Sequence, residues 1–249
     1  VPGIVLVGVS TGGPRTLEDI LPLLPADYPW PIVVAQHMPP QFTQAFAQRM
    51  DQLCALRVRE VNAVQPLEAG NIYIGQGGSD VALVQRLGRL AAQPRPEHPD
   101  HPWHPSVDVL VQSAMALLPP QQIIGVQLTG MGYDGATAMK QLHQAGGKTI
   151  AEDESTAVVF GMPRELIERQ GATTVLPSFT TRRASTTVQL RDGQSLAIEL
   201  FGPHGIPGSQ SHASEVGHVI RVVRITGKCA LELFPGCQIV ASFKVAHAT

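Results

Sequence analysis

The sequence is poor in several features that would mark a specialised class of protein. It has only three cysteines, Cys54, Cys229 and Cys237, and their spacing matches no metal or redox motif. It has no apolar run of about 18 residues, so no transmembrane helix is predicted. Its 18 Lys and Arg residues are balanced by 20 Asp and Glu residues, which gives no basic excess of the kind that nucleic-acid binding requires.

The start of the chain also lacks the basic segment of a signal peptide, because an apolar stretch runs directly into glycines. We therefore expect a cytoplasmic protein with free thiols, although Cys229 and Cys237 could pair. Hydrophobic residues make up 43% of the sequence, which is enough for a sizeable core. The length of 249 residues allows one large α/β domain, or a medium domain with a small module.

The sequence does contain an alternation of buried strands and amphipathic helices. Residues 5–8 and 32–36 are short apolar runs typical of buried parallel strands, and a stretch with helical spacing follows each of them. Later runs, "QIIGVQLTG" and "KTIAE", continue the alternation. The order predicts an α/β fold, a doubly wound and mostly parallel sheet with helices on both faces. Short strands between residues 56 and 92 are expected to form a hairpin at the sheet edge.

The pattern changes near residue 180. Residues 186–200 alternate with period two around Asp192-Gly193, which indicates a β-hairpin, and "GHVIRVVRITGKCALELF" is also strand-like. We predict two domains, one over residues 1–180 and a small β-rich C-terminal extension over residues 181–249. The sequence does not indicate what the extension does.

The first predicted strand runs into "LVGVSTGGP", which contains G-x-S-x-G around Ser10. A phosphate-binding loop would need a lysine or the spacing G-x-G-x-x-G, and neither is present, so we expect no nucleotide cofactor. Two interpretations remain open. Ser10 is either a nucleophile on a tight strand-to-helix turn or simply the cap of the next helix.

A base and a carboxylate follow other predicted strands. His37 comes after the second strand and Asp134 comes after a later one, and such strand ends meet in one crevice of a doubly wound sheet. A serine hydroxyl needs a base such as imidazole to become a nucleophile, and a carboxylate orients that base. The pattern alone leaves open whether His37 is an ordinary loop histidine and whether Asp134 caps the helix that begins at Gly135.

Longer motifs resemble one family. "GVSTGGPRTL", "VVAQHMPPQFTQAFAQRM", "NIYIGQGG", "HPSVDVL" and "GVQLTGMGYDGA" occur in the order found in the catalytic domain of the chemotaxis receptor methylesterases (CheB type), and the resemblance extends to about Pro177. These serine esterases hydrolyse glutamyl γ-methyl esters on the cytoplasmic helices of chemoreceptors, giving glutamate and methanol. Some members also deamidate receptor glutamines. The resemblance implies the same activity without a cofactor, with methylated chemoreceptor helices as partners.

The resemblance also assigns roles to individual residues. Ser10 matches the family's nucleophile, His37 its general base and Asp134 the acid that orients the base. The residues implied in oxyanion or substrate binding are Met131, through its backbone N–H, and Thr11 and Gly12 beside the nucleophile.

The chain departs from the family in two respects. Gln76 and Asp80 stand where the family commonly has the Pro and His of a Pro-Gly-Gly-x-His stretch, which puts details of the substrate rim in doubt. The usual N-terminal receiver domain does not precede the motifs. We therefore expect an excised fragment or a differently regulated enzyme, with a receiver supplied elsewhere as one alternative. A catalytically weak adaptor of a chemotaxis-like or surface-motility pathway, and a general esterase, remain the competing hypotheses.

Two clusters of polar residues suggest metal binding. His98, His101 and His104 recur every third residue, but their Pro-rich segment cannot hold a helical spacing, so we expect no metal there. The carboxylates of residues 152–154 are expected to lie in a solvated turn.

Overall fold

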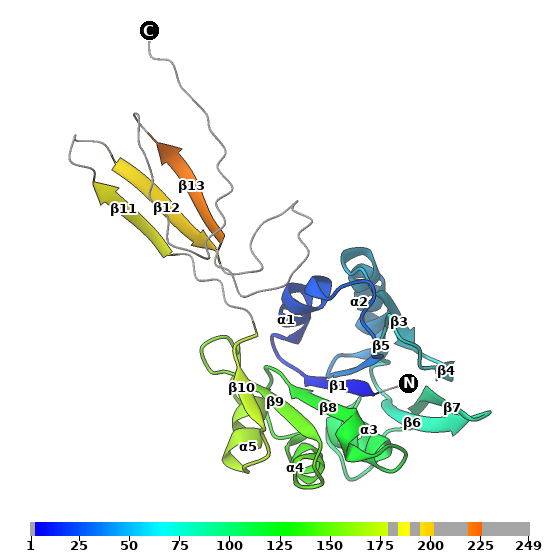
Figure 1. Ribbon diagram of the computed structural model, residues 1–249. Coiled ribbons are helices and arrows are strands. Elements are labelled where there is room, and N and C mark those ends of the chain that lie inside the picture. Colours follow the sequence, from blue (N-terminus) through cyan, green and yellow to red (C-terminus); the bar gives the residue numbers. More distant parts are fainter. Residues whose placement is uncertain (1–2, 179–183, 190–194, 202–218, 226–249) are drawn as a thin grey trace. The chain divides into compact units, whose positions relative to one another are not determined.

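The computed structural model describes residues 3–178, 184–189, 195–201 and 219–225, and the chain divides into two compact units, residues 1–179 and 180–249. The large sheet of the first unit contains β1 (Ile4–Val9), β2 (Ile32–Gln36), β3 (Arg57–Val61), β5 (Asn71–Gly75), β8 (Ile123–Gln127), β9 (Lys148–Glu152) and β10 (Thr174–Leu176). Their order is β10-β9-β8-β1-β2-β5-β3, and every neighbouring pair is parallel (Figure 1). The predicted α/β fold is confirmed.

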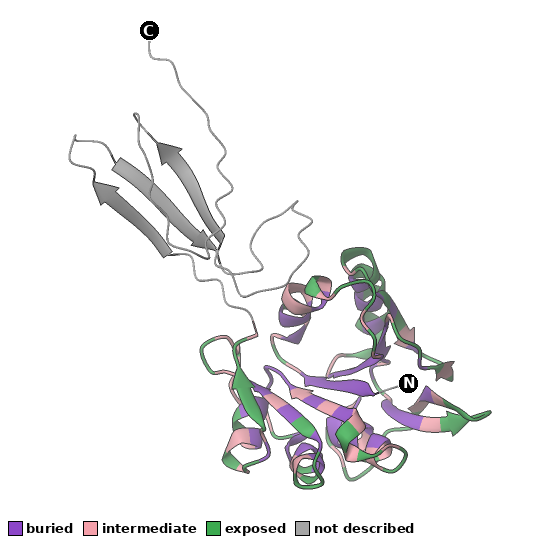
Figure 2. Cartoon of the chain, in the orientation of Figure 1, coloured by how far each residue is buried: buried purple, intermediate pink, exposed green. Residues whose placement is uncertain are grey.

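Helices cover both faces of this sheet. They are α1 (Gly13–Ile20), α2 (Pro40–Leu53), α3 (Val107–Met115), α4 (Ala136–Gln144) and α5 (Met162–Glu168), with short 3-10 helices at Leu21–Leu23 and Pro120–Gln122. Alternate residues of β1 enter two cores, because successive side chains of a strand point to opposite faces. Ile4 and Leu6 pack with α3, α4 and α5, whereas Val5 and Val7 pack with α1 and α2. Figure 2 shows β1 buried along its length.

The predicted hairpin forms, but not at the edge of the large sheet. Its strands, β6 (Asp80–Arg86) and β7 (Arg89–Arg95), pair with β4 (Gln65–Pro66) in a separate three-stranded antiparallel sheet. The apolar side chains of Val81 and Leu83 lie in the same core as α3. This face of the hairpin is buried in the core beside α3, so the hairpin packs there instead of extending the large sheet.

The second unit is described only in its strands. β11 (Ala184–Gln189), β12 (Ser195–Phe201) and β13 (Val219–Ile225) form an antiparallel sheet in that order. The predicted pairing of the two strands around Asp192-Gly193 is therefore confirmed, although residues 190–194, Cys229 and Cys237 lie outside the described residues. The predicted division into a domain over residues 1–180 and a β-rich extension over residues 181–249 stays a prediction.

No helix in the described part of the chain is both long and apolar enough to cross a bilayer.

The order of the strands places β1 at the point where the chain changes direction. From β1 the chain first builds the sheet outward through β2, and later returns to place β8 on the other side of β1. Pairing continues past the strand ends, since Ser10 N donates to Thr129 O (2.9 Å) and His37 N donates to Val9 O (3.0 Å). The segments that follow β1, β2 and β8 therefore meet in the crevice where α/β proteins place their functional groups.

Candidate active site

His37 and Asp134 form a buried hydrogen-bonded pair in this crevice. The Nε2 atom of His37 lies 2.8 Å from Asp134 Oδ2, and their side chains are 8% and 2% exposed. The second ring nitrogen, Nδ1, is buried and has no hydrogen-bond partner within the described part of the chain. The two residues are 97 positions apart in sequence, and the strand order brings them together.

The carboxylate of Asp134 also caps α3. Its Oδ2 accepts from Val107 N (2.7 Å), while Oδ1 accepts from Ser106 Oγ (3.0 Å) and Asp108 N (3.1 Å). These backbone N–H groups belong to the first turn of a helix, where donors lack partners within the helix and favour negative charge. Burial by itself raises the pKa of Asp134, but the hydrogen bonds from His37 and α3 outweigh it and lower the pKa below its ordinary value. The carboxylate is therefore ionised at neutral pH.

Ser10 lies on the tight turn that joins β1 to α1. Its carbonyl accepts a hydrogen bond from Gly13 N (2.9 Å), and the intervening Gly12 has φ +85°. A Cβ atom at Gly12 would lie 2.6 Å from Val158, so both the backbone conformation and the space require glycine there. Gly130 also approaches closely, since a Cβ there would lie 2.7 Å from Ser10 Cβ.

Ser10 and His37 continue the side of the sheet that faces α3. Ile4 and Leu6 of β1, and Val33 and Ala35 of β2, all belong to the core on that side. Since side chains alternate along a strand and the pairing continues past these ends, Ser10 and His37 have the same parity as these residues. Asp134, bound to the first turn of α3, approaches from that side too.

Two buried glutamines at the last positions of β2 and β8 hold the loops of the site. Gln36 Nε2 donates to the carbonyls of Ser10 and His37, both at 3.0 Å, and so links the segments after β1 and β2. Gln127 Nε2 donates to Asp134 O at 3.1 Å. Sequence analysis missed both residues. Their signal was a polar side chain that ends an otherwise apolar strand.

The segment after β8 is fixed by Thr129 and Glu152. Thr129 Oγ1 donates to Thr11 O (2.8 Å), and Thr129 N donates to Glu152 Oε2 (2.7 Å). Glu152 is 1% exposed, so the prediction that residues 152–154 lie in a solvated turn is wrong for it. The predicted oxyanion residues lie next to Thr129: Met131 follows it by two positions, and Thr11 is the residue whose carbonyl it binds. Within the described residues, the backbone N–H groups of Thr11 and Met131 donate to no backbone carbonyl.

The Pro- and His-rich loop packs over His37. The indole of Trp103 is stacked on the His37 imidazole, with centroids 5.9 Å apart and planes 4° from parallel. His104 Nδ1 lies 2.9 Å from Asp80 Oδ1, so one of the two residues that depart from the family holds this loop. Sequence analysis did not single out Trp103, because an aromatic residue in an irregular loop has no periodic signal.

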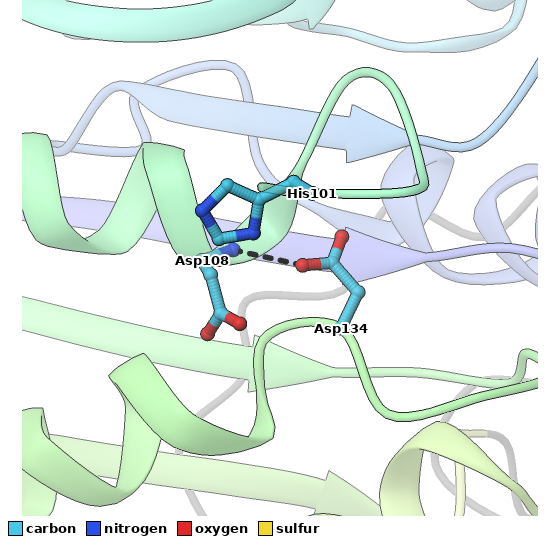
Figure 3. Close-up of side chains that lie close together, drawn as sticks. All are labelled: His101, Asp108 and Asp134. Atoms are coloured by element: carbon cyan, nitrogen blue, oxygen red, sulfur yellow. Dashed lines mark hydrogen bonds between the residues drawn. The ribbon is translucent and has the colours of Figure 1, made fainter. Parts of the chain in front are cut away.

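One of the three loop histidines, His101, lies close to Asp108 and Asp134, as Figure 3 shows. Their possible ligand atoms are all within 4.8 Å of one another. A carboxylate offers about four lone-pair positions, and Asp134 already accepts four hydrogen bonds, two at each oxygen. Asp108 Oδ1 accepts from Ala138 N (2.8 Å). Both carboxylate oxygens of Asp134 and Oδ1 of Asp108 are therefore engaged by His37 and by the first turns of α3 and α4, so this cluster does not fit a metal site.

Comparison with known proteins identifies the family. A family model described as CheB methylesterase matches residues 5–181. The chain belongs to the CheB methylesterase family. The catalytic domain of the CheB methylesterase from Thermotoga maritima has a similar structure, with a TM-score of 0.68, 40% identity, and coverage of 71% of this chain and 93% of that one.

Two relatives of this chain carry the name protein-glutamate methylesterase/protein-glutamine glutaminase. The protein of Rhodospirillum rubrum, number 3 of that name, is 56% identical over 176 residues, which is 71% of this chain and 48% of the relative. That of Symbiobacterium thermophilum is 49% identical over 184 residues, or 74% of this chain and 49% of the relative. The chain thus spans about half the length of these relatives, and the resemblance found from its motifs is confirmed.

Proposed function

We propose that this chain is a protein-glutamate methylesterase that hydrolyses glutamyl γ-methyl esters on the cytoplasmic helices of chemoreceptors. Membership of the CheB methylesterase family supports the reaction class, and the relatives' printed names support the glutamyl substrate. The single observation that carries the proposal is the buried hydrogen bond between His37 and Asp134 at the strand ends beside Ser10. It supplies an oriented base next to a serine on a tight turn.

In the proposed mechanism, Ser10 Oγ attacks the ester carbonyl and His37 takes its proton. Because the ionised carboxylate of Asp134 accepts from Nε2–H, the lone pair of the neutral imidazole is on Nδ1. Nδ1 is therefore the atom that receives the serine proton. The same atom then protonates the departing methanol, and a water activated by His37 hydrolyses the acyl-enzyme in the second half of the reaction.

The oxyanion of the tetrahedral intermediate needs hydrogen-bond donors that are already in position. We assign this role to the backbone N–H groups of Thr11 and Met131, with Gly12 forming the substrate-side turn next to Thr11. Loss of one such donor typically costs a factor of about 10²–10³ in rate. A glutamine side chain fits the same steps with ammonia as the leaving group, so deamidation of receptor glutamines is part of the proposal.

The substrate implies the setting of the reaction. Receptor methylation sites lie on cytoplasmic helices, so the proposed site of action is the cytoplasm and the proposed partner is a protein helix. A receiver domain is a further proposed partner. The proposal involves no nucleic acid, no membrane insertion and no metal.

The test is methanol release from a methylated cytoplasmic fragment of a chemoreceptor, measured for the wild type and for Ser10→Ala. We expect release by the wild type alone, with both proteins binding the fragment. If both bind and neither releases methanol when a phosphorylated receiver domain of the family is supplied, the alternative of a catalytically weak adaptor is favoured. If small acyl esters are instead turned over at the same rate as the receptor fragment, a general esterase is favoured.

A further inference from the structure

The imidazole of His37 has two contacts that together fix its orientation. Trp103 lies parallel to its plane, and Asp134 bonds its Nε2 atom at 2.8 Å. A stacking contact restricts the tilt of a ring but allows the ring to rotate within its own plane. The hydrogen bond restricts that rotation. With both contacts present, the direction of the Nδ1 lone pair is determined.

The loop that carries Trp103 is anchored on both sides of it. Asp80 is 1% exposed and accepts hydrogen bonds through Oδ1 from His104 Nδ1 (2.9 Å) and Ser106 N (2.7 Å), and through Oδ2 from His98 N (2.9 Å). The indole also makes a T-shaped contact with the ring of Tyr133, with centroids 5.0 Å apart and planes at 84°. Trp103 is therefore held in place by contacts that do not involve His37.

We propose that Trp103 is a positioning residue that orients His37 and stabilises its protonated form, within the reaction proposed above. The π face of an indole attracts a cation whose centre lies within about 6 Å of the ring centroid. His37 carries a positive charge after it accepts the serine proton, so the attraction is stronger in the transition state than in the resting enzyme. Asp80, where the family commonly has histidine, maintains this arrangement through the loop.

Other charged or titratable groups surround His37, and they are the same in a Trp103 variant. Asp134 bonds the ring directly, and His101 and Asp108 lie next to Asp134. Tyr133 contacts Trp103, and the turn after β1 contributes Ser10, which does not titrate near neutral pH. A difference between the wild type and a Trp103 variant therefore reports the indole.

The first experiment compares pH profiles of kcat/KM for methanol release by the wild type, Trp103→Phe and Trp103→Leu. Loss of the ring in Trp103→Leu should move the acid limb of the kcat/KM profile to lower pH by about 0.5 unit. It should also lower the plateau value of kcat/KM by a factor of about two to five. Trp103→Phe keeps a π face and should lie between the two. A lower plateau with an unmoved limb would mean that Trp103 only supports the loop, and would overturn the proposal.

A second measurement does not depend on activity. The titration midpoint of the His37 ring is followed by ¹⁵N NMR and assigned by its disappearance in His37→Gln. The midpoint should fall in Trp103→Leu. It should fall less in Asp80→Asn, where the indole is kept and only the hydrogen bonds that hold its loop are weakened. Trp30→Phe is the matched control, because Trp30 packs beside Gly3 at the opposite end of β1.

The two measurements separate the two proposals. If the midpoint of His37 falls in Trp103→Leu but no protein releases methanol, the proposed function fails and the role of Trp103 in stabilising the protonated ring stands. If methanol is released and the midpoint is the same in the wild type and Trp103→Leu, the proposed function stands and the inference about Trp103 is wrong.

Discussion

At the scale of single residues, Asp134 serves two structures at once. Its four hydrogen bonds orient the imidazole of His37 and satisfy the first turn of α3. The sequence left open whether Asp134 caps the helix that follows it or belongs to a catalytic set. In the structure α4 has no side-chain N-cap, and Asp134 instead caps α3 and binds His37. Substitutions can separate the contribution of Asp134 to catalysis from its contribution to stability, because only the hydrogen bond to His37 involves the catalytic base.

Asp134→Asn should lower kcat for methanol release by a factor of about 10⁴, since an amide that donates to His37 Nε2 favours the wrong tautomer. Ser106→Ala removes one hydrogen bond to the same carboxylate and the cap of α3. It should cost about 1 kcal/mol of unfolding free energy and leave kcat within about tenfold. Both variants are compared by steady-state kinetics and urea denaturation. An Asp134→Asn enzyme with more than a tenth of wild-type kcat contradicts this role.

The two neighbouring aspartates should affect the pH dependence of stability with opposite signs. The pKa of Asp134 is lowered in the fold, so its contribution is present above its ordinary value of about 4 and is lost as the pH falls through the folded pKa. Burial raises the pKa of Asp108, so its contribution is present at low pH and is lost as the pH rises through the raised value.

The measurement is the unfolding free energy of the wild type, Asp134→Asn and Asp108→Asn between pH 2.5 and pH 6. The advantage of the wild type over Asp134→Asn should shrink on acidification, and that over Asp108→Asn should shrink as the pH rises. Parallel curves for all three proteins would show that neither carboxyl group is perturbed by folding.

At the scale of elements, the site depends on how closely the loop after β8 approaches the turn after β1. Strand positions were largely predictable, because buried parallel strands are short apolar runs, and residues 32–36 were located to their ends. The hairpin β6–β7 was predicted but misplaced, since its position depends on packing against α3 and not on its own pattern. Trp103, Gln36 and Gln127 were missed because their roles exist only between segments distant in sequence.

Gly130→Ala should separate Ser10 from the loop. Its added Cβ would collide with Ser10 Cβ and the sulfur of Met162, which we expect to cost about 1–3 kcal/mol of stability and at least about a hundredfold in kcat. Gly125→Ala in β8 is the control, because its Cβ would make only ordinary contacts at 3.4 Å. If both variants behave like the wild type in thermal denaturation and methanol release, the close approach at Gly130 has no catalytic role.

At the scale of the whole molecule, every residue proposed for catalysis lies between positions 10 and 134, within the unit that ends at residue 179. The family match covers residues 5–181, and the similar structure from Thermotoga maritima is itself a catalytic domain. The change of sequence pattern near residue 180 predicts a domain boundary there, and this division stays a prediction. The sequence could not assign a role to the residues beyond this boundary, because no motif there carries recognisable chemistry.

A chain that ends at residue 179 should therefore fold and keep the activity of the full chain. We expect its melting temperature to lie within about 3 °C of the first transition of the full chain, with kcat/KM within about twofold. Calorimetry and methanol release test both points. Aggregation of the shortened chain, or a loss of activity above tenfold, would show that residues 180–249 are part of the catalytic unit.

The central claim is that Ser10 and His37 act as one unit on a glutamyl methyl ester. The most direct test is a double-mutant cycle of Ser10→Ala and His37→Gln, with methanol release from a radiolabelled, methylated chemoreceptor fragment as the readout. The account predicts that each single substitution costs nearly as much as both together, because removing either residue abolishes the same step. Losses that multiply in the double variant would contradict it, since the two residues would then contribute independently.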